Sequence, residues 1–578
     1  MLWLAALALA AAAPAGATTY YVDCTAAGDQ GDGTSTATAW RTVGRVNGSV
    51  FKPGDSILFK RGCVWYESLY PPSAGTPDGP ITFGAYGTGA NPIISGANRL
   101  TTWTREAGRI WYARQPSEIW SQIWVNNRLG DKKTAKNQLV NEYDWWWDAS
   151  TSRLYLYAPS DPDTLYTNPG VEAAQEAMAI YVGRDHIIFE NLTAEKAAYA
   201  NIAGGDPGDH VIVRNCLIQY GSRGIEVGSS DGPPYAGMEI HDNEVRYCRT
   251  TGISVIYKAS NCKIYRNRVH DVDYTFPEDP AGGGWTGTIK IFDDTGTMDN
   301  IEIFENDCYE SGPTPNDASG VGIWSDFVKP ATSVQIHHNR VYNCRGGGIF
   351  IEAVKNHHVW ANLVHNCGTN TVYDNEWTAA GIRVDTRETQ KAVDNAIYNN
   401  TVYGGRAGIL VASYSQGAGM EISRNLFKNN ILLGQTEQAL IAMLGGDNSP
   451  PYGIGNLYEN NCFGPEFTGF IRWGSSSKSS YASWEKAYGG PTNSVQADPK
   501  LTNVDGGDFT LLASSPCVDA GTDVGLTFST ALLPGSLWPT KVLTGDQSKA
   551  GPRWEVGAYV FVPPSTFVPR KVIRSQQP

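Results

Sequence analysis

The chain has 578 residues, among them 63 Gly, 29 Tyr and 18 Trp, and 18% of its residues are charged. So many aromatic residues with so few charges exclude a disordered chain, and the length allows one large solenoid or two to three domains. The net charge of −13 argues against nucleic acid and acidic membrane surfaces as partners, and mildly against a strongly polyanionic polysaccharide.

Residues 1–17 form an apolar run that ends in the small residues Ala15-Gly16-Ala17. This pattern is typical of a secretory signal peptide cleaved before Thr18. The run is too short for a comfortable membrane span, and no later segment has the composition of one. The sequence therefore predicts a secreted or periplasmic protein without a membrane partner.

We expect residues 18–100, which include FKPGDSILFKRG and ITFGAYG, to supply an amino-terminal cap and the first coils of a repeat. Residues 101–175 are rich in Trp, Tyr and turn residues and do not follow that repeat, which predicts a small inserted antiparallel β-module.

Residues 176–430 repeat one unit, of which VQIHHNRVYNCRGGGIFIE is an example. Each unit has a short strand of alternating apolar residues, an Asn, a second short strand, and a Gly-Ile pair that opens a third. The Asn column is assigned to Asn215, Asn243, Asn267, Asn306, Asn339, Asn362, Asn400 and Asn425.

This repeat predicts an all-β fold, a right-handed parallel β-helix, in which each Asn bonds a tight turn and the Asn of the next coil. Helical repeats would place apolar residues three and four apart, and a β-propeller would need Asn-Gly hairpin turns; neither pattern is present. Residues 431–578 lose the strict repeat and are expected to form the last coils and a C-terminal cap, because an open last coil would expose an unpaired edge.

Five of the ten cysteines recur at what reads as the same point of the repeat: Cys216, Cys248, Cys308, Cys344 and Cys367. Such a column predicts buried thiols rather than bridges, while Cys24 and Cys63 are candidates for a disulfide. No cysteine or histidine spacing indicates zinc.

Three acidic residues stand three positions beyond the Ile of successive Gly-Ile strands: Asp326, Glu352 and Asp385. The coils on either side place Gly228, Ile256, Phe292 and Ala412 there, so the acids form one short column. Asp293 and Asp294 follow Phe292 and are expected beside it.

Coils of a parallel sheet stack about 4.8 Å apart, so neighbouring carboxylates repel and the pKa of at least one should rise. A protonated acid beside an ionised one is what glycoside hydrolysis requires. A separation near 5 Å, as between Asp326 and Glu352, suits a retaining mechanism, and the two-coil spacing of Asp326 and Asp385 suits an inverting one.

The segments GIWSDF and GIFIEAVKNH resemble the signature of β-helical glycoside hydrolases, especially the β-xylosidases with an inserted β-module. The resemblance implies that Asp326 is the nucleophile and Glu352 the acid/base. We expect Asp385 to hold the proton on Glu352 or to bind a sugar hydroxyl. It implies a poly- or oligosaccharide substrate, with a xylan-type glycan as one candidate. Phe327 and Lys355-Asn356-His357 do not match the substrate-contacting residues of that family.

Other residues near the column are candidates for substrate binding: Trp324, Arg383, Lys290, Trp377, Asp293, Trp285 and Lys355. Aromatic rings there can stack on sugars, with core packing as the alternative. We expect no required cofactor and no dedicated metal site, with calcium as the alternative ligand of a carboxylate cluster.

Two other functions remain open. A polysaccharide lyase on the same scaffold would use Lys290, Lys355 or Arg383 for β-elimination from a uronate-containing glycan, with calcium on the acids. A non-catalytic surface or adhesive β-helix would leave the acids merely solvated.

Overall fold

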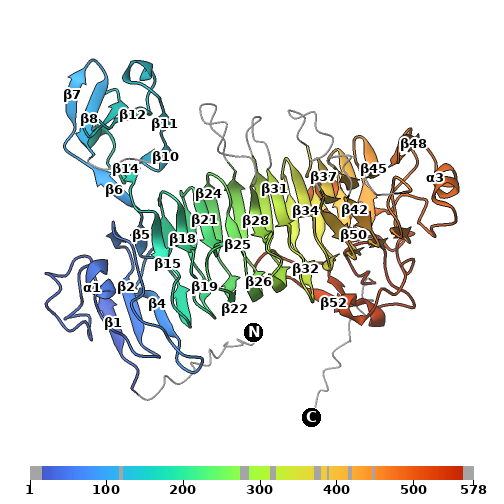
Figure 1. Cartoon of the computed structure of the whole chain (residues 1–578), viewed down its shortest axis with the longest axis horizontal. Coiled ribbons are helices and arrows are strands. Elements are labelled where there is room, and N and C mark those ends of the chain that lie inside the picture. Colours follow the sequence, from blue (N-terminus) through green and yellow to red (C-terminus); the bar gives the residue numbers. More distant parts are fainter. Residues whose placement is uncertain are drawn as a thin grey trace, which may run out of the picture.

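The computed structural model describes residues 16–115, 122–273, 286–312, 320–369, 379–386, 389–413, 419–444 and 449–563. In these ranges the chain winds into a right-handed parallel β-helix with three long sheets along its sides, as the repeat predicts (Figure 1). None of the described helices is long and apolar enough to cross a membrane.

The sheets are named here in the order in which a coil passes through them. The first contains β1 (Thr19–Val22), β2 (Ser56–Lys60), β4 (Ile81–Tyr86), β16 (Ile187–Glu190), β19 (Ile212–Arg214), β22 (Tyr235–Ala236), β23 (Glu239–His241), β26 (Ala259–Tyr265), β29 (Asp299–Phe304), β32 (Val334–His337), β35 (His357–Trp360), β39 (Ala396–Tyr398), β43 (Leu426–Lys428) and β46 (Leu457–Glu459). The second contains β3 (Val64–Trp65), β5 (Ile93–Ser95), β17 (Thr193–Glu195), β20 (Leu217–Gln219), β24 (Glu244–Cys248), β27 (Arg268–Val272), β30 (Asp307–Ser311), β33 (Arg340–Tyr342), β36 (Leu363–His365), β40 (Thr401–Tyr403) and β44 (Ile431–Leu433). The third contains β15 (Met178–Tyr181), β18 (Ala200–Gly204), β21 (Arg223–Val227), β25 (Ile253–Ile256), β28 (Gly287–Phe292), β31 (Val321–Asp326), β34 (Gly347–Glu352), β37 (Ala380–Thr386), β41 (Ala407–Ser413), β45 (Gln438–Met443), β47 (Ile471–Trp473) and β48 (Ser476–Lys478).

One coil shows why the sequence takes this form. Alternate residues of each strand point inward, and Ile323, Ile336 and Val341 have no exposed surface in the shared core. Because each strand pairs with the same strand of the next coil, the core is one continuous apolar column along the axis.

Buried Asn residues connect the coils between the first and second sheets. The backbone N–H of each Asn donates to the side-chain oxygen of the next Asn in the column, and the chain of bonds runs through Asn243, Asn267, Asn306, Asn339, Asn362, Asn400, Asn430 and Asn461. Two members of the expected column are therefore wrong. The backbone N–H of Cys216, not Asn215, bonds Asn243, and Asn425 belongs to a second ladder with Asn395 and Asn456.

The expected cysteine column is wrong for Cys216 and Cys308, although the thiols are buried and free as predicted. Cys216 lies at the ladder position and Cys308 inside β30, paired with Val341. Cys248, Cys344 and Cys367 share one corner position at the end of the second sheet, because each follows a ladder Asn at the same distance along the chain. The disulfide between Cys24 and Cys63 is confirmed.

The amino-terminal cap contains α1 (Val43–Asn47), whose N-cap Thr42 accepts from the backbone N–H of Arg45.

The inserted module follows β5 and projects from the amino-terminal end of the coil stack (Figure 1). It is built from β6 (Ala97–Leu100), β7 (Thr104–Ala107), β8 (Ile110–Arg114), β9 (Ile123–Val125), β10 (Arg128–Leu129), β11 (Asp131–Lys132), β12 (Asp144–Asp148), β13 (Arg153–Tyr157), α2 (Pro162–Leu165) and β14 (Val171–Ala174). Its strand pairs are antiparallel except β11 with β12, and Trp145 and Leu154 lie in a core of its own.

At the other end, α3 (Tyr481–Tyr488) covers the last coil with Trp484, which has no exposed surface. The chain then returns along the outside of the helix through β49 (Leu501–Asn503), β50 (Asp508–Leu511), β51 (Thr530–Leu532) and β52 (Thr544–Asp546) (Figure 1). On this return the indole of Trp538 donates to the carbonyl of His338 at 2.9 Å, and Asn399 donates to the carbonyl of Glu555 at 2.9 Å. The carboxy-terminal segment thus covers sides of earlier coils as well as the open end.

A further strand pair, β38 (Lys391–Val393) with β42 (Glu421–Ser423), lies between the third and first sheets.

Candidate active site

The three acids lie side by side on consecutive strands of the third sheet. Asp326 at the end of β31 pairs with Glu352 of β34, and Glu352 pairs with Asp385 of β37. The same column continues with Phe292 before and Ala412 after, so apolar residues bound the acids on both sides. The predicted register of this column is confirmed.

The side chains of the column lie on the outer face of the third sheet, because Ile323 and Ile351, their neighbours in the alternation, lie in the core. Even so, the acids are buried: Asp326 is 4% exposed, and Glu352 and Asp385 are 0% exposed. This burial contradicts the view that they are merely solvated charges on a soluble solenoid.

Two basic residues of the adjacent outward column neutralise part of this charge. The Nζ of Lys290 lies 2.9 Å from the carboxylate of Asp326, and Arg383 forms an ion pair with Asp385 on its own strand. The Lys290 ammonium also lies 3.9 Å from the ring centroid of Trp324, and the guanidinium of Arg383 lies 4.5 Å from that of Phe350.

Trp324 is itself 2% exposed and stacks on Phe350 with ring centroids 5.0 Å apart. These two rings form a small apolar floor beneath the cations rather than an open sugar platform. The site is therefore a buried cluster of three carboxylates and two cations beside stacked aromatics. Burying so many ionisable groups costs several kcal/mol per ion, and such clusters mark functional sites more often than structural ones.

The strand that carries Asp326 is held from inside by His357. Its Nε2 accepts from the hydroxyl of Ser325 at 2.7 Å, and its Nδ1 donates to the carbonyl of Lys355 at 2.9 Å. Burial lowers the pKa of the His357 imidazole to about 3, so the neutral ring that satisfies both bonds is the stable form.

The two remaining sequence candidates within the described residues, Asp293 and Lys355, lie in the turns that follow β28 and β34. Asp293 has no exposed surface, and its carboxylate accepts from the backbone N–H groups of Thr295, Thr297 and Met298, so it closes the turn after β28. Lys355 is exposed in the turn after β34. Trp285 and Trp377 lie outside the described residues.

Within the described ranges, side chains that could together bind a metal ion lie in one place, at Asp23, Cys24 and Cys63. The two sulfurs there form the disulfide, so this group is structural.

Two pockets among the described residues were not predicted from the sequence. One, of about 320 Å³, is on the outer face of the third sheet and includes Glu226 and Ile256. Ile256 pairs with Phe292, and Phe292 with Asp326, so this hollow runs toward the acid column.

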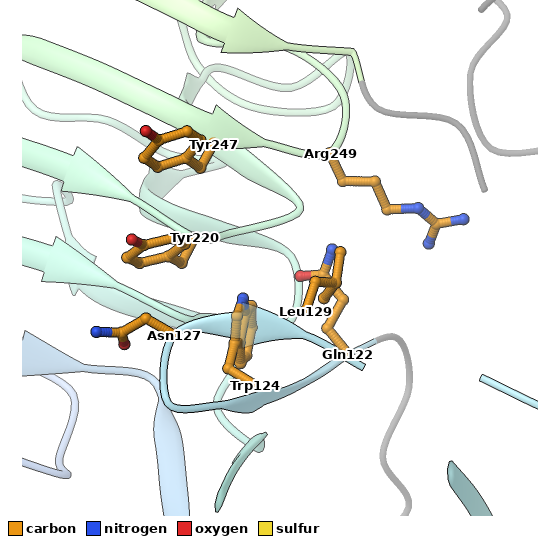
Figure 2. A pocket seen from close by; sticks show the side chains of 7 residues that line it. All are labelled: Gln122, Trp124, Asn127, Leu129, Tyr220, Tyr247 and Arg249. Atoms are coloured by element: carbon orange, nitrogen blue, oxygen red, sulfur yellow. The ribbon is translucent and has the colours of Figure 1, made fainter. Parts of the chain in front are cut away.

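The other pocket, of about 330 Å³, lies where the inserted module meets the coils (Figure 2). Repeat alignment places residues within the coils only, so it carries no signal for a contact between the module and the helix.

Comparison with known proteins bears on the fold. The family model described as a right handed beta helix region matches residues 201–379 and 299–463. Among solved structures, a complex of XylC with xylose superimposes with a TM-score of 0.52 at 15% identity, over 71% of this chain and 75% of that one. A structure named glycoside hydrolase gives 0.47 at 13% identity over 77% and 96% of the two chains, and the pectate lyase Pel9A gives 0.40 at 13% identity over 94% and 97%. No curated protein matches the sequence.

Proposed function

We propose that the protein is an exported carbohydrate-active enzyme, a glycoside hydrolase that cleaves a poly- or oligosaccharide by a retaining two-carboxylate mechanism. The observation that carries the proposal is the pairing of Asp326 with Glu352 on adjacent strands inside a buried charged cluster. The disulfide between Cys24 and Cys63 supports export, because disulfides persist in oxidising compartments. A xylan-type glycan is one candidate substrate.

The surroundings assign different roles to the two acids. Asp326 lies 2.9 Å from the Lys290 ammonium, which favours its ionised form and so its use as a nucleophile. Glu352 lies between Asp326 and Asp385 on the adjacent strand, so it is the second carboxyl of the proposed pair and takes the acid/base role.

In the first step an oxygen of Asp326 forms a bond to the anomeric carbon while the glycosidic C–O bond breaks and the leaving oxygen takes the proton of Glu352. In the second step the Glu352 carboxylate removes a proton from water, the water oxygen bonds the anomeric carbon, and the bond to Asp326 breaks. Two inversions leave the configuration unchanged. One strand spacing of about 4.8 Å fits this double displacement, whereas Asp326 with Asp385, two strands apart, would fit inversion.

The test measures hydrolysis of aryl glycosides and of plant and microbial polysaccharides, with products followed by chromatography and their anomeric form by NMR immediately after cleavage. We expect retained configuration and a loss of at least about 100-fold in kcat for Asp326→Ala and for Glu352→Ala. Asp394→Ala is the control, because Asp394 forms an exposed ion pair with Arg424 and should change little. Wild-type rates in both acid variants would remove the assignment, and an inverted product would replace Glu352 by Asp385 in the catalytic pair.

A polysaccharide lyase is the second candidate. It would need a base that is available to the substrate, yet Lys290 and Arg383 are both held in ion pairs with carboxylates of the cluster. Absorbance from a new C=C bond, lost on chelation of calcium, would support the lyase instead.

A further inference from the structure

The pocket between the inserted module and the coils, called the junction pocket here, is lined from two sides. Gln122, Trp124, Asn127 and Leu129 come from β9, β10 and the residues around them, and Tyr220, Tyr247 and Arg249 come from corners that follow β20 and end β24. The pocket has a volume of about 330 Å³, within the range of small-molecule sites.

Aromatic rings form much of its wall. Tyr220 and Tyr247 occupy the same corner of successive coils and stack with centroids 5.3 Å apart and planes 12° apart. Figure 2 shows these rings one above the other, with Trp124 of the module below them and Arg249 to their right. The side chain of Tyr247 is 38% exposed and Trp124 is 2% exposed, so the wall runs from solvent into the junction.

Gln122 supplies the observation that points to a ligand. Its side chain is 3% exposed and lines the pocket, and within the described residues its Oε1 accepts no hydrogen bond. A buried acceptor left without a donor is costly, so the site is built for a ligand that brings an O–H or N–H group. A carboxylate cannot satisfy Oε1, because both would be acceptors.

The pocket is held rigid by buried charges beneath it. The Lys196 ammonium lies 2.6 Å from Glu172 of β14 and 3.0 Å from Glu195 of β17, and it donates to the amide oxygen of Asn127 at 2.6 Å. Lys196 also lies 5.5 Å from the ring centroid of Tyr220. The module and the coils are thus locked together at the pocket, which lowers the cost of ordering it around a ligand.

We propose that the junction pocket binds one sugar ring of a neutral glycan chain at a point remote from the acid column. Aromatic walls suit the apolar face of a pyranose ring, and Gln122, Asn127 and Arg249 suit its hydroxyl rim. This inference rests on the proposed function, because the bound glycan is taken to be the substrate that the acids cleave. Binding itself does not require cleavage.

The position of the pocket defines the class of substrate. Tyr247 lies near the end of β24, the strand before β25, and Asp326 lies two coils further on and at the far end of its strand. Two coil spacings and about six residues of strand separate the sites by roughly 20 Å. One sugar ring cannot occupy both, so a chain of several residues is bound, not a disaccharide.

Binding is measured in native gels that contain xylan, arabinan, galactan, a mixed-linkage β-glucan or polygalacturonate, with Glu352→Gln as the parent protein to prevent cleavage. We expect retardation by at least one neutral polysaccharide, and a rise of about tenfold in its dissociation constant on adding Tyr247→Ala or Gln122→Leu. Tyr70→Ala is the matched control, because Tyr70 is 41% exposed on the first coils and does not line the pocket.

Retardation by none of the gels, or by polygalacturonate alone, would overturn the inference, as would unchanged binding in both Tyr247→Ala and Gln122→Leu. Two variants on different sides of the pocket guard against a local folding defect, which thermal unfolding of each would reveal. If instead the acid variants kept full activity while Tyr247→Ala lost binding, the proposed function would fail and the glycan site would stand.

Discussion

Replacement of Lys196 by Met tests how the inserted module is fixed to the coils. The ammonium lies 2.6 Å from Glu172 and 3.0 Å from Glu195, and the lysine and Glu172 side chains are 1% exposed. Burial by itself would lower the pKa of Lys196, but the carboxylates of Glu195 and Glu172 outweigh it and the pKa is raised, so the lysine is charged.

At an effective dielectric constant of 20, each pair contributes about 6 kcal/mol of attraction, most of it offset by the loss of hydration. Lys196→Met removes the attraction and leaves two carboxylates buried next to each other. We expect it to lower the free energy of unfolding by about 3–5 kcal/mol. The triple variant Lys196→Met, Glu172→Gln, Glu195→Gln leaves no uncompensated charge and should stay within about 1–2 kcal/mol of the wild type.

The assay is urea unfolding followed by tryptophan fluorescence, together with limited proteolysis of the module. The module contains Trp145 and Trp147, so its loosening is visible in both. A change below about 1 kcal/mol in Lys196→Met, or a triple variant as unstable as the single one, would refute the reasoning.

Three other outcomes are expected. His357 has a pKa of about 3 in the folded protein because it is buried, so the unfolded chain binds the extra proton as the pH falls below about 6.5. The wild type should therefore lose about 2.3 kcal/mol through this group between pH 6.5 and 4.5, and His357→Gln should show a shallower acid dependence in urea melts; equal slopes would exclude this linkage. The double change Cys24→Ser with Cys63→Ser opens a loop with a sequence separation of 39 and should cost about 4 kcal/mol, measured as earlier thermal unfolding of the amino-terminal cap; an unchanged melting curve would argue against it. Gln122→Leu removes a buried acceptor without a donor and should leave thermal stability equal or raise it by about 1 kcal/mol, while a clear loss would show that Oε1 is already satisfied.

Much of the fold could be predicted because the repeat is periodic in two ways. Alternation along each strand decides which residues enter the core, and the recurring Gly-Ile pair aligns one coil with the next. Counting from that pair placed Asp326, Glu352 and Asp385 on paired positions, and the structure has them there.

The predicted Asn and Cys columns were wrong where the residue used to align one coil with the next was ambiguous. Asn215 stands one residue before the ladder position that Cys216 occupies. Asn425 belongs to a second ladder, which also contains Asn395 and follows the additional strands β38 and β42. Cys216 and Cys308 were assigned to the cysteine column although they lie at other points of the coil. Coils of unequal length shift these residues without changing the local pattern.

The register of the acid column was therefore determined by the sequence itself, since register in a parallel stack follows from local periodicity. Only the tertiary structure decided that the column is buried, that Lys290 and Arg383 neutralise its ends, and that Asp293 closes a turn. It alone brought Gln122 and Trp124 against Tyr220 and Tyr247, about a hundred residues along the chain. The physical reason is that the module docks through side chains that belong to no repeat, so no spacing in the sequence encodes their contact.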